Sequence, residues 1–179
     1  MRIVGGKYKG RIFRPDKNFA ARPTTDIAKE ALFNILVNRY DFTGLRILDL
    51  FSGTGSIGYE FVSRGAEHVT FIEKKYSHIK FIYSVIEKLE ISNSLIVRAD
   101  VFKYINKCIN KFDIIFCDPP YDLQRIDELP GIIFQSGIIT NNGLLIIEHS
   151  KNNDFSNEPN FTELRKYGKV NFSFFVNSV

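Results

Sequence analysis

Short, nearly continuous apolar runs recur along the middle of the chain, and stretches with helical spacing lie between them. The apolar runs comprise residues 45–50, 67–73, 94–100, 112–118 and 143–149. Before the first run, apolar residues recur at intervals of three and four from Ile27 to Leu36, which predicts a helix that Thr25 or Asp26 can cap. Apolar strands that alternate with helices are typical of a parallel sheet covered on both faces, so we expect an α/β fold.

The helical stretches between the runs are less uniform. One follows a glycine-rich turn and ends near Gly65, and another is marked by apolar residues from Ile79 to Ile86. Two more are expected near 101–110 and 123–137, the latter disturbed by Pro130-Gly131.

The last segment has a different pattern, in which apolar and polar residues alternate. "FTELRKYG" (161–168) and "KVNFSFFV" (169–176) are two such runs around Gly168. A period of two predicts half-buried strands, and the glycine between them predicts a hairpin, which we expect at the edge of the sheet. The Asn-rich segment 151–160 is predicted to be a loop, and the chain shows no internal repeat.

The length and composition are those of one globular domain, which we expect to span 1–179. No apolar run approaches the roughly 20 residues of a membrane helix, and "MRIVGGKYKGRIFRP" lacks the apolar region of a secretory signal. Cys108 and Cys117 lie in different predicted elements without CxxC spacing, so neither a zinc site nor a disulfide framework is indicated. We expect a cytoplasmic protein, with a monomer as the default and no metal.

Positive charge is concentrated at the beginning of the chain. Residues 1–22 carry a formal charge of +6, whereas the other 157 residues carry −2. The basic residues of this N-terminal arm are Arg2, Lys7, Lys9, Arg11, Arg14, Lys17 and Arg22. Glycines at positions 5, 6 and 10 predict a short hairpin. An ordered cluster of cations favours contact with the phosphate backbone of a nucleic acid over the alternative of a solvated tail.

A glycine-rich turn follows the first predicted strand. Gly53-Thr54-Gly55-Ser56-Ile57-Gly58 has the G-x-G-x-x-G spacing, and Glu73 lies 20 residues after Gly53 at the end of the next strand. In nucleotide-type cofactor sites, such glycines let the backbone approach the ligand, and an acid at this distance binds a ribose hydroxyl. Several cofactors use this pattern, and a tight turn without a ligand is the alternative.

The charge at the strand ends separates these cofactors. Acidic residues lie at or near the carboxyl end of all five predicted strands, namely Asp49, Glu73, Asp100, Asp118 and Glu148. In a parallel sheet these ends converge on one crevice. Carboxylates there would repel the pyrophosphate of NAD or FAD, whereas they suit S-adenosyl-L-methionine, which carries a sulfonium and an ammonium group. Asp100 has two interpretations: it can bind the adenine amino group or simply cap a helix that begins at Val101.

Asp118-Pro119-Pro120-Tyr121 stands at the end of the fourth run and suggests the reaction. An amino group on a nucleobase is a poor nucleophile because its lone pair is delocalised into the ring. The Asp118 carboxylate and a backbone carbonyl, most simply that of Pro119, can accept its two hydrogens and favour the pyramidal form that attacks a methyl group. The prolines fix φ and bring no competing N–H, and Tyr121 offers a face on which an extruded base can stack.

Several segments resemble, in order, the RsmD family of bacterial 16S ribosomal RNA guanine(966)-N2 methyltransferases. They are "MRIVGGKYKGR", "RPTTDIAKEALFNIL", "LDLFSGTGSIGYEFVSRGA", "FIEKK", "DIIFCDPPY" and "LRKYGKVNFSFF". The resemblance covers nearly the whole chain. It implies a Rossmann-like class I methyltransferase with a seven-stranded, mostly parallel sheet whose last strand is antiparallel. It also implies S-adenosyl-L-methionine as cofactor and a guanine of 16S ribosomal RNA in the small ribosomal subunit as substrate.

The resemblance assigns roles to matching positions. Cofactor contacts are implied for Asp49, Phe51, Ser52, Gly53, Thr54, Gly55, Glu73, Lys74, Asp100, Val101 and Asp118. The Asp118–Tyr121 segment would hold the guanine, and residues 22–25 would close over the site. With the arm, the expected RNA contacts are Arg2, Lys7, Lys9, Arg11, Arg14, Arg22, Thr24 and Thr25. One position departs from the pattern, since similar proteins usually carry a basic residue where this chain has Ile27.

Three alternatives remain at this point. An adenine-N6 methyltransferase on DNA or RNA would use the same four-residue motif, because adenine also carries a ring-conjugated amine. A non-catalytic RNA-binding protein could keep the fold as a scaffold, although intact site motifs argue against it. A nicotinamide-dependent oxidoreductase is opposed by the acidic crevice. Fold analogy alone does not separate these functions.

Overall fold

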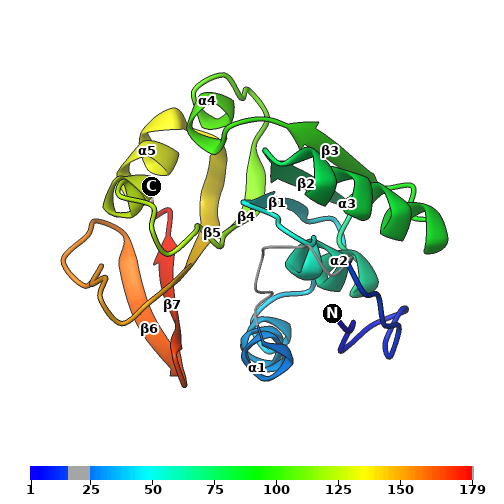
Figure 1. The fold of residues 1–179 in the computed structure, drawn as a ribbon. Helices are drawn as coiled ribbons and strands as arrows, with labels where there is room; N and C mark the ends of the chain where they lie inside the picture. Colours follow the sequence, from blue (N-terminus) through cyan, green and yellow to red (C-terminus); the bar gives the residue numbers. More distant parts are fainter. Residues whose placement is uncertain (16–24, 179) are drawn as a thin grey trace.

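A computed structural model describes residues 1–15 and 25–178, which form one seven-stranded sheet with the strand order β3-β2-β1-β4-β5-β7-β6 (Figure 1). The strands are β1 (Arg46–Leu50), β2 (His68–Glu73), β3 (Ser94–Arg98), β4 (Phe112–Cys117), β5 (Ile139–His149), β6 (Phe161–Tyr167) and β7 (Val170–Val176). The pairs among β1 to β5 are parallel, and β7 runs antiparallel to both β5 and β6. The expected C-terminal hairpin is therefore confirmed, with β7 inserted between β5 and the edge strand β6.

Helices cover both faces of the sheet. They are α1 (Asp26–Val37), α2 (Ser56–Ser63), α3 (Tyr76–Lys88), α4 (Val101–Ile105), the 3-10 helix η1 (Ile126–Glu128) and α5 (Leu129–Ser136). Because alternate strand residues face opposite sides, the buried apolar residues form two clusters. One cluster contains residues of α1, α2 and α3, and the other contains residues of α4 and α5, which lie on the opposite side of the sheet in Figure 1.

Three elements differ from their expected bounds. The helix near 101–110 ends at Ile105, so α4 is one short turn. Pro130 lies in the first turn of α5, where its missing N–H costs nothing, and it therefore marks the beginning of that helix instead of disturbing it. The strand expected at 143–149 begins at Ile139, since Ile139 already pairs with Phe112 of β4. The register of this pairing shifts before Leu144, and Asn142, in the shifted segment, has a φ of 60°.

The N-terminal arm forms the expected hairpin as far as the structure describes it. Arg2 and Ile12 make an antiparallel bridge, the Ile3 amide donates to the Arg11 carbonyl at 3.0 Å, and the Gly10 amide donates to the Ile3 carbonyl at 2.8 Å. The arm lies along α2 (Figure 1). In the described part of the chain, none of the helices has the length and hydropathy needed to span a membrane.

Candidate active site

The glycine-rich turn joins β1 to α2 in a conformation that few residues adopt. Gly53 and Gly55 have φ values of 53° and 75°, in the left-handed region that favours glycine. Phe51 also has a positive φ, 59°, although its side chain is large. Strained backbone of this kind clusters at ligand sites and persists only where the surroundings fix it. The fixing contacts come from Ser52, whose amide donates to the Ile72 carbonyl at 3.0 Å and whose hydroxyl donates to the Asp49 carbonyl at 2.7 Å.

Glu73, at the carboxyl end of β2, holds the same turn. Its Oε2 accepts a hydrogen bond from the Gly53 amide at 2.9 Å, and its Oε1 accepts from the amides of Lys74 and Lys75 at 2.7 and 2.8 Å. His78 Nδ1 lies 3.2 Å from Oε2. The spacing of 20 residues thus brings the acid and the first glycine together. A carboxylate can accept about four hydrogen bonds, so its predicted contact with a ribose hydroxyl stays compatible with these bonds.

Gly58 allows α2 to pack closely on the sheet. A Cβ at this position would lie 2.1 Å from Cε1 of Phe71 in β2, closer than any real contact. The close packing also brings the Gly58 amide within 3.2 Å of Asp49 Oδ2. Asp49 is buried beneath the turn, 2% exposed, on the face of the sheet that α2 covers. The third glycine of the motif therefore positions helix and acid together.

Three acidic residues lie at the carboxyl ends of adjacent strands. Cys117 pairs with Leu50 on one side and with Ile147 on the other, so the register places Asp118 beside Glu148 and next to the end of β1. The Asp118 amide donates to the Leu50 carbonyl at 3.3 Å. Glu148 is buried, 3% exposed. The structure therefore brings together three of the five acids predicted at the strand ends, namely Asp49, Asp118 and Glu148.

The pKa values of these acids show how strongly the site favours positive charge. Burial raises the pKa of Asp49 to about 8; the Gly58 amide opposes the shift, and the negative charge of Glu73 adds to it. Burial also raises the pKa of Asp118 well above its usual range, and Glu148 and Asp49 raise it further. No basic side chain of the described residues contributes to either shift. A cation at the strand ends would supply the missing charge, so the site fits S-adenosyl-L-methionine better than a phosphate-bearing cofactor.

The segment after β4 presents acceptors and an aromatic ring. Pro119 is buried, whereas Pro120 and Tyr121 are exposed, with 65% of Tyr121 accessible. The Pro120 carbonyl accepts from the Leu123 amide at 2.9 Å, which closes the turn. For the Pro119 carbonyl, no such donor is found within 1–15 and 25–178. Its role as an acceptor for the substrate stays a prediction.

Asp100 caps α4, as one of its two interpretations predicts. Its Oδ1 accepts from the Lys103 amide at 3.3 Å, and its Oδ2 lies 3.5 Å from Lys74 Nζ. Val101, the first residue of α4, is buried. The N-cap role of Asp100 does not exclude a contact with an adenine, and that contact stays a prediction. Of the other expected cofactor residues, Ser52 and Thr54 are buried and Phe51 is half-buried.

The basic side chains of the described part of the arm are exposed to solvent. The exposed basic residues of the described arm are Arg2, Lys7, Lys9, Arg11 and Arg14. Arg2 forms an ion pair with Asp26 at 3.4 Å. Thr25 is exposed and caps α1, accepting from the Ala28 amide at 3.2 Å. Lys17, Arg22 and Thr24 lie outside the described residues.

Two buried charged residues at this site were not predicted from the sequence. Lys29 and Glu60 are each 0% exposed, and their charged atoms lie 3.6 Å apart between α1 and α2. A usable signal existed, because Lys29 falls on the apolar face of the predicted helix with Leu32 and Phe33. A lysine is seldom buried there unless it has a partner. Among the described residues, no group of three or more His, Cys, Asp or Glu could hold a metal ion.

Comparison with known proteins places these features in context. The model of the family described as Conserved hypothetical protein 95 matches residues 1–176. The chain is 33% identical over 155 residues to YlbH of Bacillus subtilis, provisionally named an rRNA methyltransferase, covering 84% of this chain and 83% of that protein. It is 32% identical over 181 residues to "Ribosomal RNA small subunit methyltransferase D" of Buchnera aphidicola, covering 99% and 92%.

A solved structure agrees in fold. The protein yhhF of Escherichia coli, provisionally described as a methyltransferase, superposes with a TM-score of 0.87 at 24% identity, covering 100% of this chain and 98% of that one. With the strand order and the antiparallel β7, this likeness shows that the fold is that of class I methyltransferases.

Proposed function

We propose, from the premise that this chain belongs to the family described as Conserved hypothetical protein 95, that it methylates the exocyclic N2 amino group of a guanine in 16S ribosomal RNA. The methyl donor is S-adenosyl-L-methionine, and the substrate is the RNA of the small ribosomal subunit in the cytoplasm. The observation that carries the proposal is the half-buried Asp118, followed by two prolines and an exposed Tyr121, beside Asp49 and Glu148. The name of the Buchnera relative supports the choice of small-subunit RNA, with guanine 966 the target implied by the RsmD resemblance.

The cofactor supplies an electrophilic methyl group on a sulfonium. Glu73 would bind the ribose with the acceptor capacity that its three amide donors leave, and Asp100 would accept from the adenine amino group. Asp49, beneath the turn, would stabilise the positive charge of the methionyl end. The backbone of residues 51–55, with Val101 and Lys74 beside it, would line the pocket.

Asp118 and the Pro119 carbonyl would hold the amino group of the base. Both are acceptors, so each would take one hydrogen of the amine and direct its lone pair away from the ring. Asp118 accepts in this way only when ionised. Burial favours its protonated form, and the negative charges of Glu148 and Asp49 add to this effect, so a cation beside the carboxyl would favour the ionised acceptor. A preorganised acceptor of this kind contributes on the order of 10²-fold to the rate.

The surroundings of Asp118 fit a base that is extruded from its stack. Tyr121 would stack on the extruded guanine, since its ring is accessible and lies three residues after Asp118. The exposed cations of the described arm would bind phosphates on both sides of the base.

A transfer assay with labelled S-adenosyl-L-methionine tests the proposal. The acceptors are small ribosomal subunits that lack the modification, deproteinised 16S RNA and DNA, each followed by nucleoside analysis. N2-methylguanosine in the ribosomal RNA is the expected product, and the first two acceptors show whether the particle or the bare RNA is the substrate. N6-methyladenosine would instead favour the adenine-N6 activity. Cofactor binding without any transfer would contradict catalysis on these acceptors and favour a binding role.

A further inference from the structure

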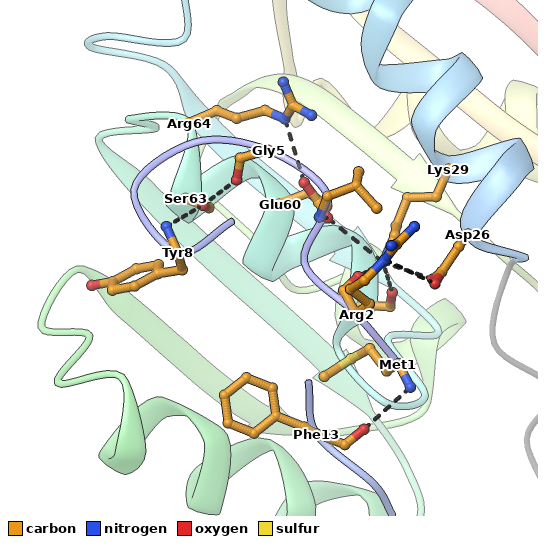
Figure 2. Close-up of polar contacts among 12 residues, drawn as sticks. Met1, Arg2, Gly5, Tyr8, Phe13, Asp26, Lys29, Glu60, Ser63 and Arg64 are labelled. Carbon is orange, nitrogen blue, oxygen red and sulfur yellow. Dashed lines mark hydrogen bonds and ion pairs between the residues drawn. The ribbon is translucent and has the colours of Figure 1, made fainter. Parts of the chain in front are cut away.

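Lys29 connects three parts of the molecule that the proposed function uses separately. Its ammonium donates to the hydroxyl of Ser56 at 3.0 Å and to the Arg2 carbonyl, and it lies 3.7 Å from Asp26 Oδ1. Figure 2 shows Lys29 and Glu60 directed toward each other, with Arg2 and Asp26 beside them. The side chain is fully buried, which lowers the pKa of Lys29, while the negative charges of Glu60 and Asp26 oppose that shift.

Glu60 extends this contact into the arm. Its Oε1 accepts from the Val4 amide at 2.5 Å, and its Oε2 lies 3.4 Å from Arg64 Nε. One turn further along α2, Ser63 binds the arm a second time (Figure 2). Its hydroxyl donates to the Gly5 carbonyl at 2.5 Å and accepts from the Tyr8 amide at 2.9 Å. The arm is therefore attached to α2 at two places, of which only the first involves Lys29.

The first attachment also reaches the cofactor turn. Ser56 is the first residue of α2 and follows Gly55 directly, so a displacement of the turn moves the oxygen to which Lys29 donates. A buried ammonium depends on its oxygen partners, because losing any of them leaves charge in an apolar environment. The ammonium group of Lys29 thus contacts both the end of the turn and the arm.

We propose that Lys29 is a positioning residue that couples the N-terminal arm to the cofactor turn, so that cofactor binding orders the arm for RNA. This inference rests on the proposed function for the nature of the cofactor. If the pair of Lys29 and Glu60 were purely structural, it would stabilise the arm equally with and without the ligand.

Hydrogen–deuterium exchange of residues 1–13, with and without S-adenosylhomocysteine, tests the coupling without any RNA. In the wild-type protein, saturation with this ligand should slow exchange of the arm by about fivefold or more, the lower end of typical coupling between sites. The variant Lys29→Met/Glu60→Gln removes the cation but leaves no unpaired buried carboxylate, and glutamine still accepts from Val4. Its arm should exchange faster, and the ligand should not change the rate.

Ser63→Ala is the matched control. It removes the two hydroxyl bonds of the second attachment and leaves only the backbone bond from the Lys7 amide to the carbonyl of residue 63 at 2.6 Å. It does not touch Ser56 or the turn, so exchange should be faster in both states while the ligand effect persists. A ligand effect that is equal in wild type and Lys29→Met/Glu60→Gln would overturn the proposal, as would no effect in the wild type.

Calorimetry on the same samples separates this proposal from the proposed function. If S-adenosylhomocysteine binds and methyl transfer occurs but the arm does not respond, the coupling alone is wrong. If the wild-type protein does not bind the ligand at all, the assignment of the cofactor fails, and the coupling fails with it.

Discussion

Asp49 holds a proton in the ligand-free protein at neutral pH, because burial raises its pKa to about 8. A cation at the strand ends favours the ionised carboxylate, so binding of S-adenosyl-L-methionine should release this proton. We therefore predict that the affinity for S-adenosyl-L-methionine rises as the pH increases toward 8. Above that pH the contribution of Asp49 should level off, since the residue is already ionised.

The size of the change in cofactor affinity with pH follows from the raised pKa of Asp49. Release of the Asp49 proton alone changes the dissociation constant by about tenfold per pH unit, or ~1.4 kcal/mol, so this residue should contribute roughly 100-fold over the two units below its pKa. The free energy of unfolding of the ligand-free protein should change in the opposite direction. Because the pKa of Asp49 in the folded protein lies above its ordinary value of 3.8, this contribution is complete below about pH 4 and is lost as the pH rises through about 8.

Calorimetry across this pH range, in buffers with different heats of ionisation, measures both the affinity and the number of protons released. Asp49→Asn should reduce the release by one proton, whereas Glu87→Gln on the exposed side of α3 should match the wild-type protein. An affinity that is constant between about pH 6 and 8 would refute the reasoning, and so would an Asp49→Asn variant that keeps the full release.

Two further predictions concern the arm and the packing of α2. Neutralising the exposed cations of the arm (Lys7, Lys9 and Arg11) should weaken RNA binding and flatten its salt dependence in a filter-binding series; an unchanged slope would argue against phosphate contacts. Gly58→Ala should lower the free energy of unfolding in urea by about 1–3 kcal/mol, because its Cβ would lie 2.1 Å from Phe71. Gly131→Ala is the control, since a Cβ there meets open space and should not destabilise the protein. Equal stability of the two variants would contradict the close packing.

The sheet could be predicted because its central strands are buried on both faces. β1 and β4 appear in the sequence as apolar runs, and the acids near their carboxyl ends mark where the strands end. The beginning of β5 could not be predicted, because Asn141-Asn142-Gly143 has the composition of a turn. In the structure Asn142 takes a positive φ inside the strand, where the pairing with β4 shifts register and the Asn142 amide donates to the Asn177 carbonyl at 2.8 Å.

The site could be predicted where it depends on local spacing. Gly53 contacts Glu73 because one follows β1 and the other is the last residue of the adjacent parallel strand β2. The pairing of Lys29 with Glu60 depends instead on how α1 packs against α2. The position of Lys29 on the apolar face of its helix suggests burial, but nothing in the sequence identifies Glu60 as its partner. The alternatives for Asp100 could not be separated for a related reason, since an acid before a helix serves as a cap whether or not a ligand lies beside it.

The most direct test of the account is a single-turnover assay of Asp118→Ala beside the wild-type protein. Both proteins are saturated with labelled S-adenosyl-L-methionine and mixed with small ribosomal subunits that lack the modification. The wild-type protein should form N2-methylguanosine in 16S RNA, and the variant should be slower by on the order of 10²-fold or more while its cofactor affinity changes little. An equal rate of transfer in the two proteins would contradict the role of Asp118, and with it the mechanism proposed for this site.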